Sequence, residues 1–328
     1  MSAEVMKTTT KVGAFFKKIP IEGNTLSLAI ALVALSTVWT ILSPYFLTLQ
    51  NIMNVLMFAS ILAIRASGLT IAMILGGLDI SQNSVGAVAA LLAALASSAG
   101  APWWLVIILV IGLSLLMGIV NSTLITVFKI AAIITTLGTM QIFRGVAWLI
   151  KDATVMVKDP VLLKLGRGRF FGVVPYIALI AIAILLVTWY LLKYTAFGRK
   201  VYMVGGNEQA SYLSGINSNK VKFMAFIFSS LTAGIAGFLL ACQVGAALPQ
   251  SGAGTEMATI SAVILGGISL AGGKGKISGT ILGVLILQVI NNGLTLLSVN
   301  AYFQMVVSGS VLLLAVLIDI VRSGMLKK

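Results

Sequence analysis

The chain has 328 residues, of which 59% are hydrophobic and 9% are charged, whereas soluble domains carry about 25% charged residues. Such a chain cannot cover itself with a water-facing surface, which excludes a separate soluble domain. With no histidine and one cysteine, it can form neither an internal disulfide nor a Ser-His-Asp or Cys-His set, so we expect no catalytic residue and no metal site with soft ligands.

The apolar runs are continuous and about 20 residues long, the length of helices that cross a bilayer. In lipid every backbone N–H and C=O must be paired internally, so only helices or a closed barrel can span, and barrel strands would alternate over about ten residues instead. The predicted fold is therefore all-α, a polytopic transmembrane helical bundle of about ten spans. In chain order these spans cover residues 26–46, 51–78, 84–98, 104–128, 131–150, 174–194, 221–247, 257–271, 277–298 and 302–321. The spans 84–98 and 257–271 are short for a hydrocarbon core of about 30 Å, so we expect them to be tilted, broken or re-entrant.

The basic residues account for a net charge of +14, and they gather beside the apolar runs, which is the pattern that orients membrane proteins rather than one that binds nucleic acid. They precede the first run, flank the segment 195–220 and follow the last run, and an even number of predicted spans separates these places. We therefore expect both the N- and C-termini to be cytoplasmic. The residues concerned are Lys7, Lys11, Lys17, Lys18, Lys193, Arg199, Lys200, Lys220, Lys222, Arg322, Lys327 and Lys328. The loop 151–173 is also basic, although this scheme places it outside. The first run has full spanning length and no small-x-small cleavage end, so we expect an uncleaved first span.

The segment 195–220 is the longest polar stretch on the predicted cytoplasmic side. Its pattern is a glycine pair that breaks structure, a good N-cap, an acidic first turn, a small apolar face and a terminating glycine. These residues are Gly205, Gly206, Asn207, Glu208, Ala210, Leu213 and Gly215. They predict a short capped helix outside the membrane, which is either an ordinary interfacial helix or one that is ordered by docking onto another protein.

This segment also carries a family resemblance. Glu208-x-Ala210 followed by Gly215 resembles the cytoplasmic coupling loop of permease subunits in ATP-binding-cassette importers, and residues 198–216 resemble the ribose-type sugar permeases in particular. Three further stretches resemble that family in the same order, so that the likeness covers about residues 30–320. They are 76–81 (GGLDIS), 134–138 (ITTLG) with Arg144-Gly145, and 262–279 (AVILGGISLAGGKGKISG) continuing to 291–294 (NNGL).

The resemblance implies a multi-pass subunit of the bacterial inner (plasma) membrane, surrounded by lipid, that is not itself an enzyme. It implies three protein partners: a second permease copy or a paralogue, a cytoplasmic ATPase that binds ATP-Mg, and a periplasmic sugar-binding protein. It implies import of a monosaccharide, a pentose or hexose, with no cofactor on this chain and with the 205–216 helix docked in a cleft of the ATPase. The domains expected are a cytoplasmic segment 1–25, a transmembrane permease domain 26–321 with the coupling loop 195–220, and a cytoplasmic tail 322–328.

The sequence departs from the family at a few positions. Arg65 stands where the family has a small or apolar residue, Gln82-Asn83 replaces Val-Gly, and Ala258 replaces Asp. A charge at the centre of a spanning helix costs about 2.5–3.5 kcal/mol, so Arg65 is expected to face the bundle interior. Three interpretations of it remain: it lines the solute pathway, it forms a structural ion pair for which Glu256 is the better candidate partner, or it snorkels.

Several polar residues inside or beside the spans are candidates for the pathway. Asp79 follows a glycine pair at a predicted helix break, where it either binds sugar hydroxyls or a cation or caps the cytoplasmic end of the third span together with Ser81 and Ser84. The uncharged candidates suit a polyhydroxyl solute, although helix–helix hydrogen bonds are the commoner use of such residues. The full set is Arg65, Asp79, Asn121, Thr135, Thr136, Glu256, Asn291 and Asn292.

Two other functions are alternatives to a sugar importer. An ion-coupled secondary transporter needs carboxylates or histidines within its spans, and only Asp79, Glu256 and Asp319 come near membrane depth, each close to a span end. An importer of nucleosides or of a sugar-like signalling molecule is also compatible. The segment 272–277 (GGKGKI) resembles a phosphate loop but lacks its Gly-Lys-Ser/Thr ending, so we expect a glycine-rich turn there.

Overall fold

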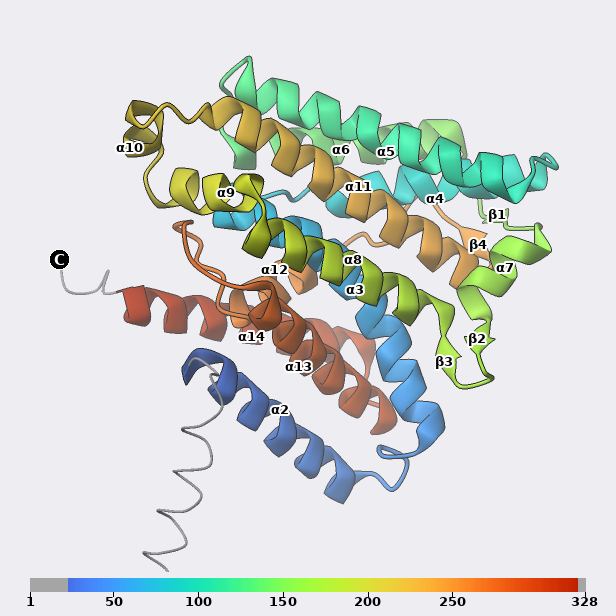
Figure 1. The fold of residues 1–328 in the computed structure, drawn as a ribbon. Helices are drawn as coiled ribbons and strands as arrows, with labels where there is room; N and C mark the ends of the chain where they lie inside the picture. Colours follow the sequence, from blue (N-terminus) through green and yellow to red (C-terminus); the bar gives the residue numbers. More distant parts are fainter. Residues whose placement is uncertain (1–22, 324–328) are drawn as a thin grey trace, which may run out of the picture.

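The computed structural model describes residues 23–323, a bundle of helices that run mostly lengthwise beside one another (Figure 1). The helices of the first half are α2 (Gly23–Leu42), α3 (Leu49–Ile74), α4 (Gln82–Ser98), α5 (Trp103–Thr126), α6 (Ala132–Ile150) and α7 (Pro160–Arg167). Those of the second half are α8 (Tyr176–Tyr194), α9 (Ala196–Gly206), α10 (Glu208–Leu213), α11 (Ser218–Val244), α12 (Glu256–Leu265), α13 (Ile277–Leu296) and α14 (Ala301–Ser323).

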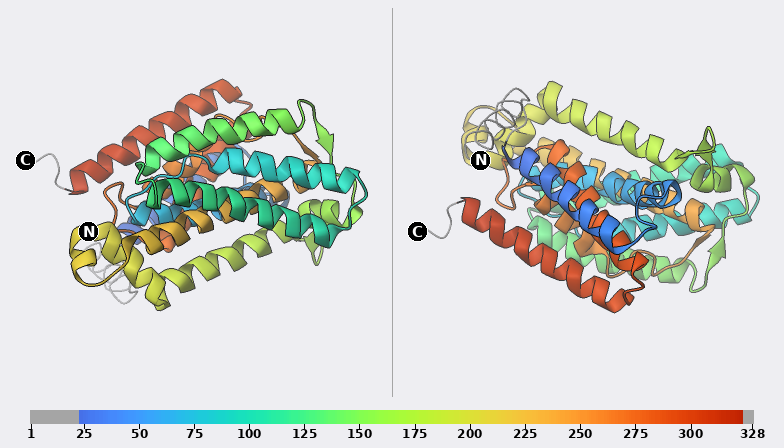
Figure 2. Two further views of the ribbon diagram at one scale, coloured as in Figure 1. Left: turned by 90° about the horizontal axis from the view of Figure 1, so that it is seen from above. Right: turned by 90° about the horizontal axis from the view of Figure 1, so that it is seen from below.

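The bundle has two distinguishable ends. Helices α9 and α10 lie at one end, called here the α10 end, together with the start of α2 and the end of α14 (Figures 1 and 2). Helix α7 lies at the opposite end, the α7 end, with two short antiparallel pairs of strands. One pair joins β1 (Val155–Met156) to β4 (Ala246–Ala247), and the other joins β2 (Arg169–Phe170) to β3 (Val174–Pro175). The segments 151–173 and 195–220 therefore lie at opposite ends, as predicted.

The outer surface is apolar enough to face lipid. In the described part of the chain, seven helices are long and apolar enough to cross a membrane, and α4 and α12 are shorter apolar helices. Large hydrophobic side chains point outward, such as Leu149, which is 88% exposed, and Ile41, which is 79% exposed. A helical membrane protein is thus confirmed, whereas the count of about ten spans stays a prediction. Residues 1–22 and 324–328 lie outside the described residues, and with them the predictions for most of the two terminal segments; the side chain of Asp319 is not described either.

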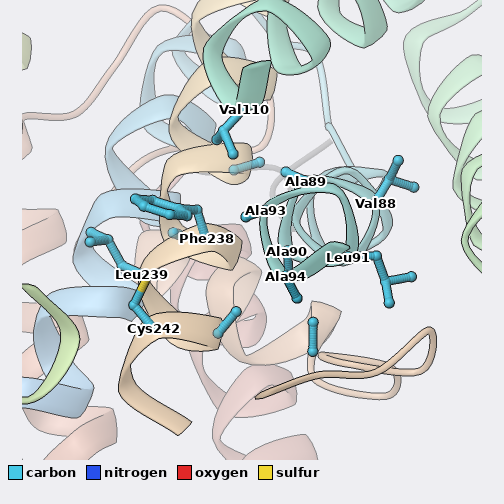
Figure 3. Packing of buried hydrophobic residues seen from close by; sticks show 14 of the residues in the cluster. Val88, Ala89, Ala90, Leu91, Ala93, Ala94, Val110, Phe238, Leu239 and Cys242 are labelled. Atoms are coloured by element: carbon cyan, nitrogen blue, oxygen red, sulfur yellow. The ribbon is translucent and has the colours of Figure 1, made fainter. Parts of the chain in front are cut away.

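Helix α11 lies at the centre and packs against α3, α4 and α5. Its crossing with α4 depends on a pair of glycines, because a Cβ built on Gly237 would overlap the backbone of Gly86. Beyond this crossing, alanines of α4 pack against Phe238, Leu239 and Cys242 of α11 and Val110 of α5 (Figure 3). Small residues of this kind let helix backbones approach closely inside membranes.

Three predicted span ends are wrong by several residues, each at a glycine. Helix α3 ends at Ile74 rather than 78, α12 at Leu265 rather than 271, and α11 runs over 218–244 rather than 221–247. Gly76, Gly267 and Gly245 have φ values of +77°, +84° and +85°, a left-handed conformation that ends helices. Of the two short predicted spans, 257–271 is broken, since α12 ends at Leu265, whereas 84–98 lies within the continuous helix α4. Non-helical stretches precede both helices, residues 75–81 before α4 and 248–255 before α12.

The segment 151–173, predicted to be a loop, contains a helix. Residues 160–167 form α7, because Asp159 caps it by accepting hydrogen bonds from the backbone N–H groups of Val161 and Leu162. Arg167, at its last turn, donates to the carbonyl oxygens of Gln243 and Val244 and so satisfies the C-terminal end of α11. This structural use explains in part why the loop is basic although the orientation rule predicts otherwise.

Candidate functional site

The predicted capped helix is present as α10. Asn207 accepts a hydrogen bond from the backbone N–H of Ala210 at 2.9 Å, which is the N-cap geometry. At the other end, Gly215 has φ +78°, and the N–H of Ile216 donates to the carbonyl oxygen of Ser211, as in a glycine-terminated helix. Gly205 and Gly206 are the last two residues of α9, so helical structure does end at this pair before α10 begins.

Helix α10 presents an apolar tip to its surroundings. Tyr212 is 73% exposed and Leu213 is 81% exposed, and Ala210 is exposed beside them. Glu208 pairs with Lys222 of α11 at 2.6 Å, which ties the first turn of α10 to the bundle. A groove of about 810 Å³ opens beside the helix, lined by Glu208, Gln209, Tyr212, residues 215–219 and Lys129. Exposed aromatic and aliphatic side chains on a short capped helix form a surface that a partner protein can bind.

Helix α9 contacts, through backbone atoms, the end of α3 and the non-helical residues that follow α12. We call α3 and α12 the interrupted helices. A Cβ built on Gly205 would overlap the carbonyl oxygen of Ile74, the last residue of α3, and would lie 2.8 Å from the backbone nitrogen of Gly273. That nitrogen donates to the same carbonyl at 2.7 Å. Tyr202 of α9 also donates to the carbonyl oxygen of Gly275 at 2.9 Å. We call the contact of Ile74, Gly205 and Gly273 the glycine junction; it joins α9 to the breaks after α3 and α12.

Arg144 holds the non-helical stretch between β4 and α12 through hydrogen bonds to its backbone. Arg144 of α6 donates from one nitrogen to the carbonyl oxygens of Pro249, at 2.6 Å, and Ser251, at 2.9 Å. Glu256 lies 3.8 Å from the same guanidinium. Irregular backbone is tolerated at membrane depth only where protein covers it or it lines a cavity. Arg144 appears in the sequence analysis only as part of a family motif. A charge inside an apolar helix is itself a sign that the residue binds polar groups in the bundle interior.

Arg65 lies in the bundle interior, as expected, but not in an ion pair with Glu256. It is 7% exposed, so the snorkelling interpretation is wrong, and Glu256 forms its ion pair with Arg144. Arg65 donates instead to Asn83 at 2.8 Å, which in turn donates to the carbonyl oxygen of Gly252 at 2.7 Å. The sequence shows Asn83 only as a departure from the family pattern and gives no sign that it links Arg65 to Gly252.

Asp79 lies in a buried polar network near mid-height of the bundle. Its two carboxylate oxygens accept hydrogen bonds from the N–H and hydroxyl of Ser81 and from the hydroxyl of Ser229, and Asp79 is 2% exposed. Ser229 is the twelfth of the 27 residues of α11, so the carboxylate is far from either helix end. The expected cap at the cytoplasmic surface is therefore wrong in position, although Asp79 does bind the N–H of the residue that precedes α4.

Three of the five uncharged candidates make side-chain hydrogen bonds to distant parts of the chain. Asn51 and Asn292 exchange two side-chain hydrogen bonds, at 2.9 and 2.8 Å. Asn121 donates to Ser81, and Thr136 donates to the carbonyl oxygen of Leu78. Buried oxygens of Asn121, Thr135 and Asn291 have no hydrogen-bond partner, so these three retain capacity for a solute. Among the described residues, no group of three His, Cys, Asp or Glu side chains could hold a metal ion.

Comparison with known proteins places these features in a family. Residues 51–316 match the family described as "Branched-chain amino acid transport system / permease component". The chain is 37% identical to a ribose import permease protein of Haemophilus influenzae over 295 residues, which cover 88% of this chain and 91% of that protein. It is 39% identical to the ribose import permease protein of Bacillus subtilis over 288 residues, 87% and 89% of the two chains. An autoinducer 2 import system permease protein of Photorhabdus luminescens is 34% identical over 291 residues, 88% of each chain. No solved structure matches.

Proposed function

The chain belongs to the family of branched-chain amino acid transport system permease components, and from this premise we propose that it is the membrane subunit of an ATP-driven importer of a monosaccharide, a pentose or hexose. As a permease it transports rather than catalyses. Its similarity to the ribose import permeases of two bacteria supports the sugar class. The autoinducer 2 relative favours a sugar-like signalling molecule as the second candidate.

The observation that carries the proposal is the position of α10. An energy-coupling partner needs an exposed surface that is rigidly connected to the solute pathway. Tyr212 and Leu213 provide the exposed surface, and the glycine junction connects the preceding helix to both interrupted helices. In the proposed mechanism α10 docks in a cleft of a cytoplasmic ATPase, which binds ATP-Mg. Closure of the ATPase then moves α9 against Ile74 and Gly273 and opens or closes the pathway.

The remaining parts of the importer follow from this assignment. We propose about ten spans in the inner membrane, with the α10 end and both termini in the cytoplasm, so that the α7 end receives solute from a periplasmic sugar-binding protein. A second permease, either a copy of this chain or a paralogue, completes the pathway.

Uptake of labelled D-ribose into energised membrane vesicles tests the proposed function. An ATP-driven importer loses uptake when ATP is depleted and keeps it when an uncoupler dissipates the ion gradients. Uptake that the uncoupler abolishes, or uptake by this chain without any ATPase subunit, contradicts the proposal and favours the ion-coupled transporter.

A further inference from the structure

Arg65 forms part of the wall of a cavity inside the bundle. The cavity has a volume of about 160 Å³ and lies between α3, α4, α11 and the stretch after β4. Most of its lining is small and apolar, and its polar side chains are those of Arg65, Asn83 and Ser251. Because a water molecule needs about 10–15 Å³ by this kind of measure, the space holds roughly ten waters or the polar end of a small solute.

The guanidinium of Arg65 is only partly used by the protein. One nitrogen donates to Asn83 at 2.8 Å, and Nε is buried without a hydrogen-bond partner. A guanidinium offers five N–H donors in a rigid fork. Leaving buried charged donors unpaired is costly, so a structural role in holding Asn83 accounts for one hydrogen bond and leaves the rest of the fork unexplained.

The charges around the cavity do not balance. Glu256 attracts the charge of Arg65 and Arg144 repels it, and the nearest ion pair of Glu256 is with Arg144, at 3.8 Å. The carboxylate of Asp79 is not among the charged groups that act on Arg65. Two guanidiniums thus share one carboxylate, and the N-terminus of α4, which carries a partial positive charge, adjoins the cavity through Asn83. The surroundings favour an anion.

We propose that the cavity binds a carboxylate of the transported solute through the fork of Arg65, so that the substrate is a sugar acid (an aldonate or a uronate) rather than a neutral sugar. This inference rests on the proposed function. A carboxylate is the planar, bidentate partner that a guanidinium fits best. Arg65 lines the cavity, the Nη end of its guanidinium makes one hydrogen bond, to Asn83, and this end forms the binding edge; the small side chains of α4 and α11 leave room for the sugar.

Matched pairs of solutes test the proposal, because the members of each pair differ mainly in the carboxylate. The complete importer, with its ATPase and binding protein, is reconstituted in liposomes, and ATP-dependent uptake is compared for D-ribose and D-ribonate, D-galactose and D-galacturonate, and D-glucose and D-glucuronate. We expect at least one acid to enter about tenfold faster than its neutral partner, and Arg65→Gln to lower that preference about tenfold. Arg65→Lys keeps the charge but not the fork, so it should retain part of the preference.

The control is Arg167→Gln, which also removes a guanidinium that binds backbone carbonyls but lies outside the cavity; the acid preference should not change. All variants share one binding protein, so a change in the ratio belongs to the permease. Faster uptake of the neutral member of every pair by the unmodified importer overturns the proposal even if Arg65→Gln fails to assemble, and it leaves the importer function standing. ATP-dependent uptake of none of the six solutes contradicts the proposed function itself.

Discussion

The Cα of Gly205 packs directly against the carbonyl group of Ile74, and there is no room for a side chain between them. The first residue belongs to α9, immediately before the coupling helix α10, and the second ends α3, immediately before the break that leads to Asp79. Because the contact is between two backbones, and the Gly273 N–H donates to the same carbonyl, it has little capacity to absorb movement. We therefore expect a shift of α10 to reach the bundle interior through this contact and through the hydrogen bond from Tyr202 to Gly275.

Replacing Gly205 with alanine should abolish this close approach. The added methyl group overlaps the carbonyl of Ile74, so α9 must move away from α3, and we expect solute uptake to fall about tenfold or more while the ATPase still binds. Gly206→Ala is the matched control, since a Cβ at Gly206 meets no atom within 4 Å. Uptake and ATPase activity are measured on the reconstituted importer. Equal effects of the two substitutions would rule out a special role of the junction.

Replacing Glu208 and Gly215 together with alanine should uncouple ATP hydrolysis from uptake. The first change removes the ion pair with Lys222, and the second forces alanine into a left-handed conformation at φ +78°, at a cost of about 1–2 kcal/mol. Insertion into the membrane should be unaffected, because α10 lies at the end of the bundle. Gly100→Ala is the control. It imposes the same kind of strain at φ +82°, but just after the C-terminal end of α4, which lies beside β1 at the α7 end, and it should leave coupling intact. Normal uptake by the double variant would count against the coupling role of α10.

Arg144→Gln should loosen the non-helical stretch between β4 and α12. The carbonyl groups of Pro249 and Ser251 lose their donor, and each orphaned buried group costs about 1–3 kcal/mol. We expect a lower thermal unfolding temperature in detergent and faster maleimide labelling of a cysteine placed at Gln250. The comparison is Arg167→Gln, whose carbonyl partners lie at an exposed site that water can reach. An unchanged unfolding temperature and labelling rate for Arg144→Gln would show that these hydrogen bonds do not hold the stretch.

The pair Asn51 and Asn292 should stabilise the bundle without taking part in transport. Each amide is both donor and acceptor for the other, so Asn51→Leu and Asn292→Leu alone should each destabilise the protein. The double variant should recover part of the loss, with a coupling energy of about 0.6 kcal/mol and at most about 1.7 kcal/mol, as found for such bonds inside membranes. A double-mutant cycle of unfolding free energies measures it. Loss of uptake in the double variant at unchanged stability would instead return Asn292 to the pathway.

Local chemistry made much of the fold predictable. The caps of α10 could be predicted because Asn207 and Gly215 act within a few residues of themselves, and the helices could be predicted because apolar runs of spanning length have few alternatives in lipid. The glycine pair before Asp79 indicated a helix break, although the predicted ends of α3 and α12 lay several residues too far along the chain. What remained unpredictable was which distant segments meet: Gly205 has no local sign that Ile74 lies against it, and its pairing with Gly206 resembled an ordinary break.

In the candidate site, too, local features could be predicted from the sequence, whereas contacts between distant segments could not. A charge inside an apolar helix indicates an interior position, which Arg65 confirms, but its partner was misassigned because Glu256 reaches Arg144 instead. The stretch 248–255 lay between two predicted spans and resembled an ordinary loop, so the need of its carbonyls for donors became visible only in three dimensions. Asp79 was placed at the wrong depth because the sequence does not show that α3 ends inside the bundle.

The most direct test of the central claim is a cross-linking measurement on the purified importer complex. A cysteine replaces Leu213 at the exposed tip of α10, and in a second variant a cysteine replaces Phe171, which is 89% exposed at the α7 end; the native Cys242 is buried. With a short bismaleimide, the account predicts that the cysteine at position 213 cross-links to the ATPase subunit in an ATP-dependent manner and that the cysteine at position 171 does not. Cross-linking of the ATPase from position 171, or from neither position in a complex that transports, would contradict it.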